Sequence, residues 1–270
     1  MKKRIISIML SVMLVLITIM SATPAEKAQA DSGASIFSSK LDLTNKEKVE
    51  WKSKLITKEE YIEYYNSLSK AEKLEMNQRR VDALQRYSDM LSKSMHSSRS
   101  SGSWNLGYCT LPRSFTIYPQ NTENWCGLAC IQSILLYLTG ASPTQETFAS
   151  DLGLSVYDRI NNTKMTTLLN SNQSIQNYYY YIPYGLDGMA SLIYEAIAIN
   201  HVPACLLIST KGGKYWRYDC SDGHYLVSHW IAPSTERIGI ADPYAGYVGV
   251  PQYYEERYDT VYNVIEEVIC

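Results

Sequence analysis

The run Ser97–Ser103, which reads Ser-Ser-Arg-Ser-Ser-Gly-Ser, divides the chain into two parts of different composition. Small polar residues and glycine have little to bury, so we predict a flexible Ser/Gly linker here and a site of easy proteolysis. Residues 31–96 before it are rich in lysine and glutamate, whereas residues 104–270 are rich in tyrosine and poor in lysine and arginine. We therefore expect one folded domain, residues 104–270, preceded by an extension.

The first thirty residues are predicted to be a cleaved signal peptide. A basic start at Lys2–Arg4 precedes the uncharged run Ile5–Met20, and Ala28-Gln-Ala30 fits a small-x-small cleavage site. The apolar run is short for a membrane span, which needs about 20 residues. We expect cleavage after Ala30 and a secreted bacterial protein, extracellular or associated with the cell wall, with no membrane contact after cleavage.

Residues 31–96 have the pattern of helices. Capping boxes, in which a hydroxyl residue precedes a glutamate by three positions, begin at Thr44, Thr57 and Ser69. After Ser69, helical spacing places one apolar face at Leu74, Val81, Leu84 and Leu91. Such a segment is too small to form a core alone. We expect it to dock on the following domain, either as a pro-segment that inhibits the domain or helps it to fold, or as a spacer.

Residues 104–270 are predicted to form an α+β domain. Helices are expected first, from Cys126 to Leu138 with an end at Gly140, and then at 143–152 and 188–200. Strands are expected afterwards, at residues 202–209, 224–232, 237–241 and 247–253. Helices followed by antiparallel strands in one compact unit are typical of α+β folds.

Charge and cysteine content narrow the function classes. Residues 104–270 carry 8 Lys/Arg against 15 Asp/Glu, so this part lacks the basic surface that nucleic-acid binding needs. The cysteines and histidines show no paired ligand spacing, and we expect no metal and no cofactor. Six cysteines in an exported chain permit disulfides. If Cys126 and Cys130 stay free, two bridges in any of three pairings are open to Cys109, Cys205, Cys220 and Cys270.

Four residues carry the groups needed for acyl transfer by a cysteine. Cys126 stands at the predicted start of a helix, where the helix dipole favours a thiolate. Gln120, six residues earlier, can donate from its amide to a developing oxyanion, together with the backbone amide of Cys126. His224 opens a predicted strand, and Asp242 follows the next strand. A hairpin of that length would place the carboxylate beside the imidazole.

Other residues compete for two of these positions. His229 lies five residues after His224 and so on the opposite face of a regular strand, and only one of the two can face Cys126. We favour His224, which follows Gly223. Asp219 and Asp222 are too close in sequence to His224 to approach its ring from a neighbouring strand. The plain alternatives are a buried structural cysteine, a polar loop glutamine and an Asp-Pro turn.

The motifs Gln-x5-Cys-Gly, Gly-His-Tyr-x-Val and Ile-x-Asp-Pro-x-x-Gly, within about residues 108–255, resemble the papain-like cysteine peptidase superfamily. The nearest group is similar to the bacteriocin-processing peptidases that cut double-glycine leaders. The resemblance implies a papain-like fold with Cys126 as nucleophile, His224 as general base and then acid, Asp242 orienting it, and Gln120 lining the oxyanion hole. Papain itself usually has asparagine where Asp242 stands.

The resemblance implies a thiol protease that hydrolyses a peptide or isopeptide bond of a peptide or protein substrate. Papain-like enzymes often carry a helical inhibitory pro-segment, as in a zymogen, and residues 31–96 resemble one in kind. Two other functions remain open. The acyl group could pass to an amine, which would make a crosslinking acyltransferase. The domain could instead be a non-catalytic binding module with a tyrosine-rich face, although we expect tyrosines such as Tyr178–Tyr181 to lie in the core.

Overall fold

The computed structural model of the protein describes residues 58–97, 108–245 and 249–270. The expected signal peptide, the capping boxes at Thr44 and Thr57 and the linker residues 98–103 lie outside these ranges. Within them, no helix is both long enough and apolar enough to cross a membrane. Nor does the described part of the chain contain a group of three His, Cys, Asp or Glu side chains placed to hold a metal ion.

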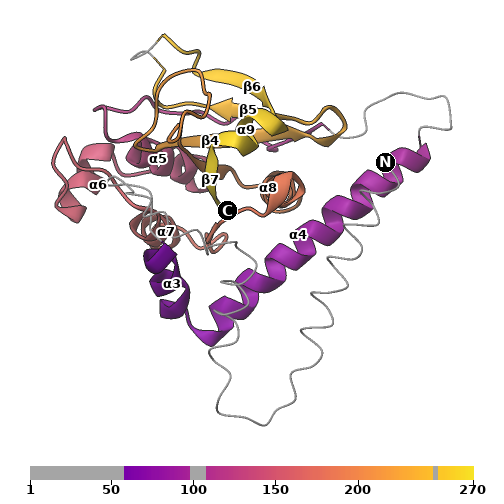
Figure 1. Ribbon diagram of the computed structural model, residues 1–270. Coiled ribbons are helices and arrows are strands. Elements are labelled where there is room, and N and C mark those ends of the chain that lie inside the picture. Colours follow the sequence, from indigo (N-terminus) through magenta and orange to yellow (C-terminus); the bar gives the residue numbers. More distant parts are fainter. Residues whose placement is uncertain (1–57, 98–107, 246–248) are drawn as a thin grey trace.

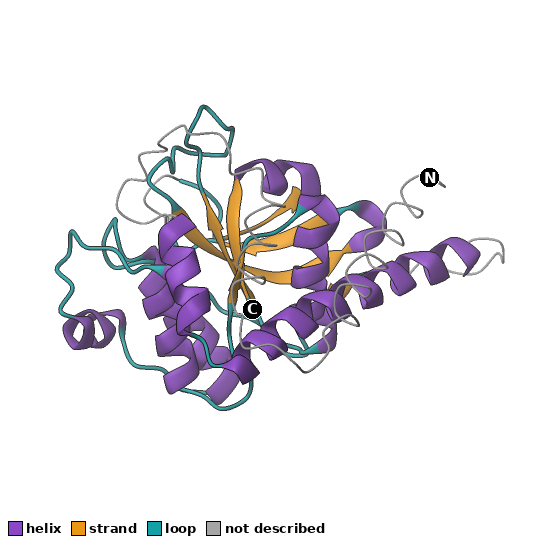
Figure 2. Cartoon of the chain, turned by 60° about the horizontal axis from the view of Figure 1, so that its bottom comes forward, coloured by secondary structure: helices purple, strands orange, loops and turns teal. Residues whose placement is uncertain are grey.

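The domain is built around one antiparallel sheet of seven strands, at the centre of Figure 2. Its order is β2-β7-β3-β4-β5-β6, and the short β1 pairs with β4 outside this path. The bounds are β1 Cys109–Thr110, β2 Tyr180–Tyr181, β3 Ala204–Ile208, β4 His224–Ala232, β5 Arg237–Ala241, β6 Tyr253–Arg257 and β7 Ile265–Ile269. Strand β7 is therefore inserted between β2 and β3, as an interior strand one place from the β2 edge.

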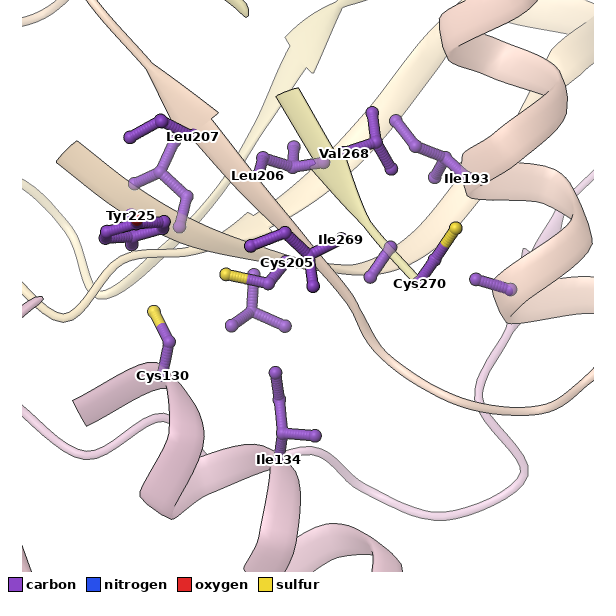
Figure 3. Packing of buried hydrophobic residues seen from close by; sticks show 14 of the residues in the cluster. Cys130, Ile134, Ile193, Cys205, Leu206, Leu207, Tyr225, Val268, Ile269 and Cys270 are labelled. Atoms are coloured by element: carbon purple, nitrogen blue, oxygen red, sulfur yellow. The ribbon is translucent and has the colours of Figure 1, made fainter. Parts of the chain in front are cut away.

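Helices cover both faces of the sheet. They are α5 (Cys126–Thr139), α6 (Gln145–Leu152), α7 (Asn162–Ser171), α8 (Gly185–Tyr194), which continues into the π-helical turn η1 (Glu195–Ile199), and α9 (Tyr258–Val264). Figure 3 shows Cys130 and Ile134 of α5 on the side of the sheet where Cys205 points, whereas Ile193 of α8 lies with Val268 on the other side. Successive side chains of β3 and β7 thus pack on opposite faces of the sheet, in the two halves of one core.

The α+β class, helix α5 and strands β4 and β5 agree with the sequence predictions. Helix α5 ends where expected, because Gly140 adopts a left-handed conformation (φ 79°) and its N–H donates to the Leu136 carbonyl. The strand predicted at 247–253 is wrong, since β6 begins at Tyr253. Helix α7 was not predicted, because its Asn- and Thr-rich sequence resembles a loop. Asn161 nevertheless caps it by accepting from the Lys164 N–H.

Two further helices precede the linker, α3 (Lys58–Ser67) and α4 (Lys70–Ser97). The capping box at Ser69 is present: the Glu72 carboxylate accepts from the Ser69 N–H, and the Ser69 hydroxyl accepts from the Glu72 N–H. The predicted apolar face is wrong in part, since Leu74 is 67% exposed. The buried face of α4 instead carries Met76, Ala83 and Tyr87.

These two helices pack on the side of the domain formed by β2, α8 and η1 (Figure 1). The Tyr64 ring stacks on that of Tyr180, with centroids 3.9 Å apart. The Arg86 guanidinium makes a two-pronged contact with the buried Glu195 carboxylate, at 2.5 and 2.8 Å. Tyr178–Tyr181 are all buried, as expected for core residues rather than for a binding face.

All six cysteines are free thiols in this structure. The bridges that the sequence left open between Cys109, Cys205, Cys220 and Cys270 are therefore absent. The Cys205 side chain faces Cys130 instead, with which it shares a hydrogen bond in the core below the sheet (Figure 3). Burial raises the pKa of the Cys130 thiol well above its usual value, so this thiol stays neutral.

Candidate active site

Cys126 is the first residue of α5 and lies against the sheet. The helix can approach so closely because the next residue is glycine: a Cβ at position 127 would lie 2.3 Å from Ile160 Cγ2 and 3.1 Å from Tyr225 Cδ2. Tyr225 is itself fixed, since its hydroxyl donates to Asn162 at the start of α7. A side chain at Gly127 would therefore push Cys126 away from β4.

His224 and Asp242 come from neighbouring strands. His224 is the first residue of β4, and Asp242 directly follows β5, which pairs with β4. His224 Nε2 lies 3.0 Å from Asp242 Oδ1, and both side chains are buried. The Cys126 side chain hydrogen-bonds the same imidazole. Because Nε2 is used by Asp242, Nδ1 is the ring nitrogen left for the thiol, and the three groups form a Cys-His-Asp series.

The surroundings of His224 favour its charged form. Burial by itself lowers the pKa of an imidazole, but the facing Cys126 thiolate and the Asp242 carboxylate outweigh it and raise the pKa of His224 from 6.5 to about 9. At the start of α5 the helix dipole adds further stabilisation to a negative sulfur. The arrangement is thus suited to a thiolate–imidazolium pair near neutral pH.

Asp242 is held by more than the histidine. Its Oδ2 accepts from the Tyr218 hydroxyl at 2.7 Å and from the Tyr254 hydroxyl at 2.8 Å. Its Oδ1 also accepts from the Tyr244 backbone N–H at 2.9 Å. Burial raises the pKa of a carboxyl, yet the contacts with His224, Tyr218 and the Tyr244 amide keep the pKa of Asp242 below its usual value. The carboxylate therefore stays ionised although it is fully buried.

Gln120 lies in the loop before α5 and is 2% exposed. Its backbone N–H donates to the Pro243 carbonyl at 2.9 Å, which ties it to the turn that carries Asp242. Its Nε2 donates to the Thr122 carbonyl at 2.8 Å. An amide nitrogen has two hydrogens, so the second N–H remains for another acceptor. Gln145 steadies this loop from α6, because it accepts from the Asn121 N–H and donates to the Pro119 carbonyl.

Aromatic rings enclose the imidazole. The Tyr218 and Tyr244 ring centroids lie 5.5 and 5.4 Å from that of His224. Cys126 is only 1% exposed and His224 only 5%. The Cys126 and His224 side chains are therefore largely shielded from solvent.

The residues that competed with His224 and Asp242 in the sequence have other partners. His229 stacks on Phe115 and meets the Tyr253 ring edge-on, and burial lowers the pKa of its imidazole to about 4. The Asp219 carboxylate accepts from the Thr210 hydroxyl. Asp222 forms an ion pair with Arg159, whose guanidinium also binds Asn124 in the loop before Cys126.

Sequence reasoning missed Tyr218, Tyr254 and Gln145 as neighbours of the site. A buried carboxylate such as that of Asp242 needs hydrogen-bond donors, and strand β6, which pairs with β5, can supply them. The strand was expected to end at Tyr253, however, and this left Tyr254 outside it. Tyr218 lies in the loop between β3 and β4, whose path no periodicity in the sequence indicates.

Residues 113–269, more than half of the chain, match a family model described as the Peptidase_C39 like family. The matched segment includes Gln120, Cys126, His224 and Asp242 and begins after α4. A comparison with curated proteins finds no match.

Proposed function

The chain belongs to the Peptidase_C39 like family, a family of papain-like cysteine peptidases, and from this premise we propose that it is an exported peptidase that hydrolyses peptide or isopeptide bonds. Cys126 serves as the nucleophile, His224 as the general base and acid, and Asp242 as the group that orients the imidazole. Gln120 contributes to the oxyanion hole. The family match supports cysteine peptidase activity in general, and the roles of these four residues are part of the proposal.

One observation carries this proposal. The His224 ring lies between a carboxylate 3.0 Å from Nε2 and the thiol of Cys126, and Cys126 begins a helix. A buried structural cysteine needs neither an imidazolium nor a helix N-terminus beside it. Cys130, one turn later on α5, is such a structural thiol, since its neighbour is Cys205 and not a histidine.

The proposed reaction follows from these positions. The Cys126 thiolate attacks the substrate carbonyl carbon, and a C–S bond forms. The second N–H of Gln120, with the backbone amide at the start of α5, stabilises the oxyanion. Imidazolium His224 gives its proton to the leaving amine as the C–N bond breaks, which leaves a thioester. His224 then takes a proton from water, which attacks the thioester and releases the acid, and the thiol returns.

Export and the role of the extension are further parts of the proposal. The basic start, apolar run and Ala-x-Ala sequence of residues 1–30 support export with cleavage after Ala30. The contacts of α3 and α4 with Tyr180 and Glu195 support docking of residues 31–96 on the domain. These contacts lie on the side of the domain formed by β2 and η1.

The test is cleavage of a diverse peptide library, followed by mass spectrometry, with the wild type and Cys126→Ala. We expect new peptide ends with the wild type and none above background with Cys126→Ala, because the thioester cannot form. Cys130→Ala is the matched control, since it removes a buried thiol of the same helix without touching the site, and it should cleave the same bonds. Equal cleavage by Cys126→Ala would refute the proposal. Products that carry an added amine would indicate acyl transfer instead of hydrolysis.

A further inference from the structure

We propose that Tyr218 and Tyr254 are positioning residues, which hold the Asp242 carboxylate in one orientation beside His224. The inference rests on the proposed function of this site. It assigns a role to two side chains that lie outside the Cys-His-Asp series.

The two oxygens of the Asp242 carboxylate have different hydrogen-bond partners. Oδ1 faces His224 Nε2 at 3.0 Å and the Tyr244 backbone N–H at 2.9 Å. Oδ2 faces away from the histidine and takes both tyrosine hydroxyls, at 2.7 and 2.8 Å. Rotation of the carboxylate about its Cβ–Cγ bond would break all four contacts. The hydroxyls therefore fix the oxygen that aims at the imidazole.

The two tyrosines come from separate segments that meet at Asp242. Tyr218 lies in the loop before β4, and its ring stands edge-on to the His224 ring at 84°. Tyr254 lies on β6, and the Arg217 guanidinium covers its ring at 4.2 Å. Both rings are thus held independently of their hydroxyls. A change from tyrosine to phenylalanine should remove the hydrogen bond and leave the packing in place.

The charge of the site explains the preference for a carboxylate. Imidazolium His224, the Tyr244 amide and two hydroxyls all donate to the Asp242 carboxylate, which accepts on both of its oxygens. An asparagine could keep hydrogen bonds to the tyrosines, because their hydroxyls can also accept from its NH2 group. It would, however, bring no negative charge to the buried imidazolium.

The protonation state of His224 depends on how the Asp242 carboxylate is oriented. The titratable groups that face His224 are Cys126 from α5, Asp242 and Tyr244 from the turn after β5, and Tyr218 from the loop before β4. The Tyr244 ring covers the remaining side. The imidazolium therefore depends on the Asp242 carboxylate being ionised and aimed at it. If the carboxylate turns away, burial dominates and the imidazole loses its proton at lower pH.

The test uses the whole secreted chain with Tyr218→Phe, Tyr254→Phe and the double variant. Two measurements are made: the rate of iodoacetamide alkylation of Cys126 across about pH 5 to about pH 9, and the titration of His224 by NMR. We expect each single variant to react about 3- to 10-fold more slowly, and the double variant about 30-fold or more. The His224 titration should move to lower pH in each.

Tyr178→Phe is the matched control. Its hydroxyl is also buried and also loses one hydrogen bond, to the Pro203 carbonyl at 3.2 Å, but it lies away from the site. It should leave the titration of His224 unchanged, which separates positioning from a general loss of stability. If the double variant titrates like the wild type, or at higher pH, the positioning role is refuted. The NMR titration decides this even if the wild type cleaves no peptide, an outcome that would refute the proposed function alone.

Discussion

Replacing His224 with alanine is expected to reduce peptide-bond hydrolysis by about 10²- to 10⁴-fold, the range typical for loss of a general acid–base. The pKa of His224 is raised from 6.5 to about 9, so the charged imidazolium persists in the folded protein until the pH approaches about 9. Its loss removes both the charge that favours the thiolate and the proton that the leaving amine needs. Initial rates on a peptide selected from the library would measure the effect.

His229→Gln provides the matched control for this experiment. His229 is on the same strand, but its pKa is lowered to about 4 by burial, so it is neutral and packs between Phe115 and Tyr253. Hydrolysis by this variant should stay within a few-fold of the wild type. Comparable losses in both variants would mean that the strand, and not the His224 imidazole, limits the rate, and would count against the assignment.

Asp242→Asn is expected to be at least as harmful, with a loss of about 10³- to 10⁴-fold, as when the carboxylate of a catalytic triad becomes an amide. The amide no longer supplies the negative charge that stabilises the imidazolium. The pH dependence of hydrolysis would show this directly, with an alkaline limb that moves to lower pH than in the wild type.

The same substitution has a second expected result. In the Tyr218→Phe, Tyr254→Phe background, the hydroxyls that hold the Asp242 carboxylate in its orientation are gone. The further loss caused by Asp242→Asn should then be smaller than in the wild type, which is the sign of residues that act through one another. Full activity of Asp242→Asn in the wild-type background would contradict the requirement for a carboxylate.

The elements that position the site could be predicted from the sequence where periodicity and end signals agree. Helix α5 has a continuous apolar run and a glycine cap at Gly140. Strands β4 and β5 have apolar residues bounded by turns, and the 18-residue separation of His224 and Asp242 fits their hairpin. These signals are local, and each is backed by a physical reason that does not depend on the rest of the fold.

The parts that could not be predicted depend on tertiary contacts. Helix α7 is stabilised by the Asn161 cap and by burial of Met165 and Leu169. Neither contribution could be predicted from the composition of this segment. The buried face of α4 is the one that packs against α8 and η1. Met76 and Ala83 are buried, whereas Leu74 is exposed. Strand β7 could not be placed either, because its partners β2 and β3 are distant in sequence.

The central claim is that Cys126 is an activated nucleophile paired with His224. The most direct measurement is the rate of iodoacetamide alkylation of each cysteine in the non-reduced wild-type protein across about pH 5 to about pH 9, located by mass spectrometry. We expect Cys126 alone to react rapidly. Its reaction should persist to about pH 6, and this low-pH reaction should be lost in His224→Ala. Labelling of Cys126 only above about pH 8.5, as for an ordinary thiol, or a Cys126 blocked in a disulfide, would contradict it.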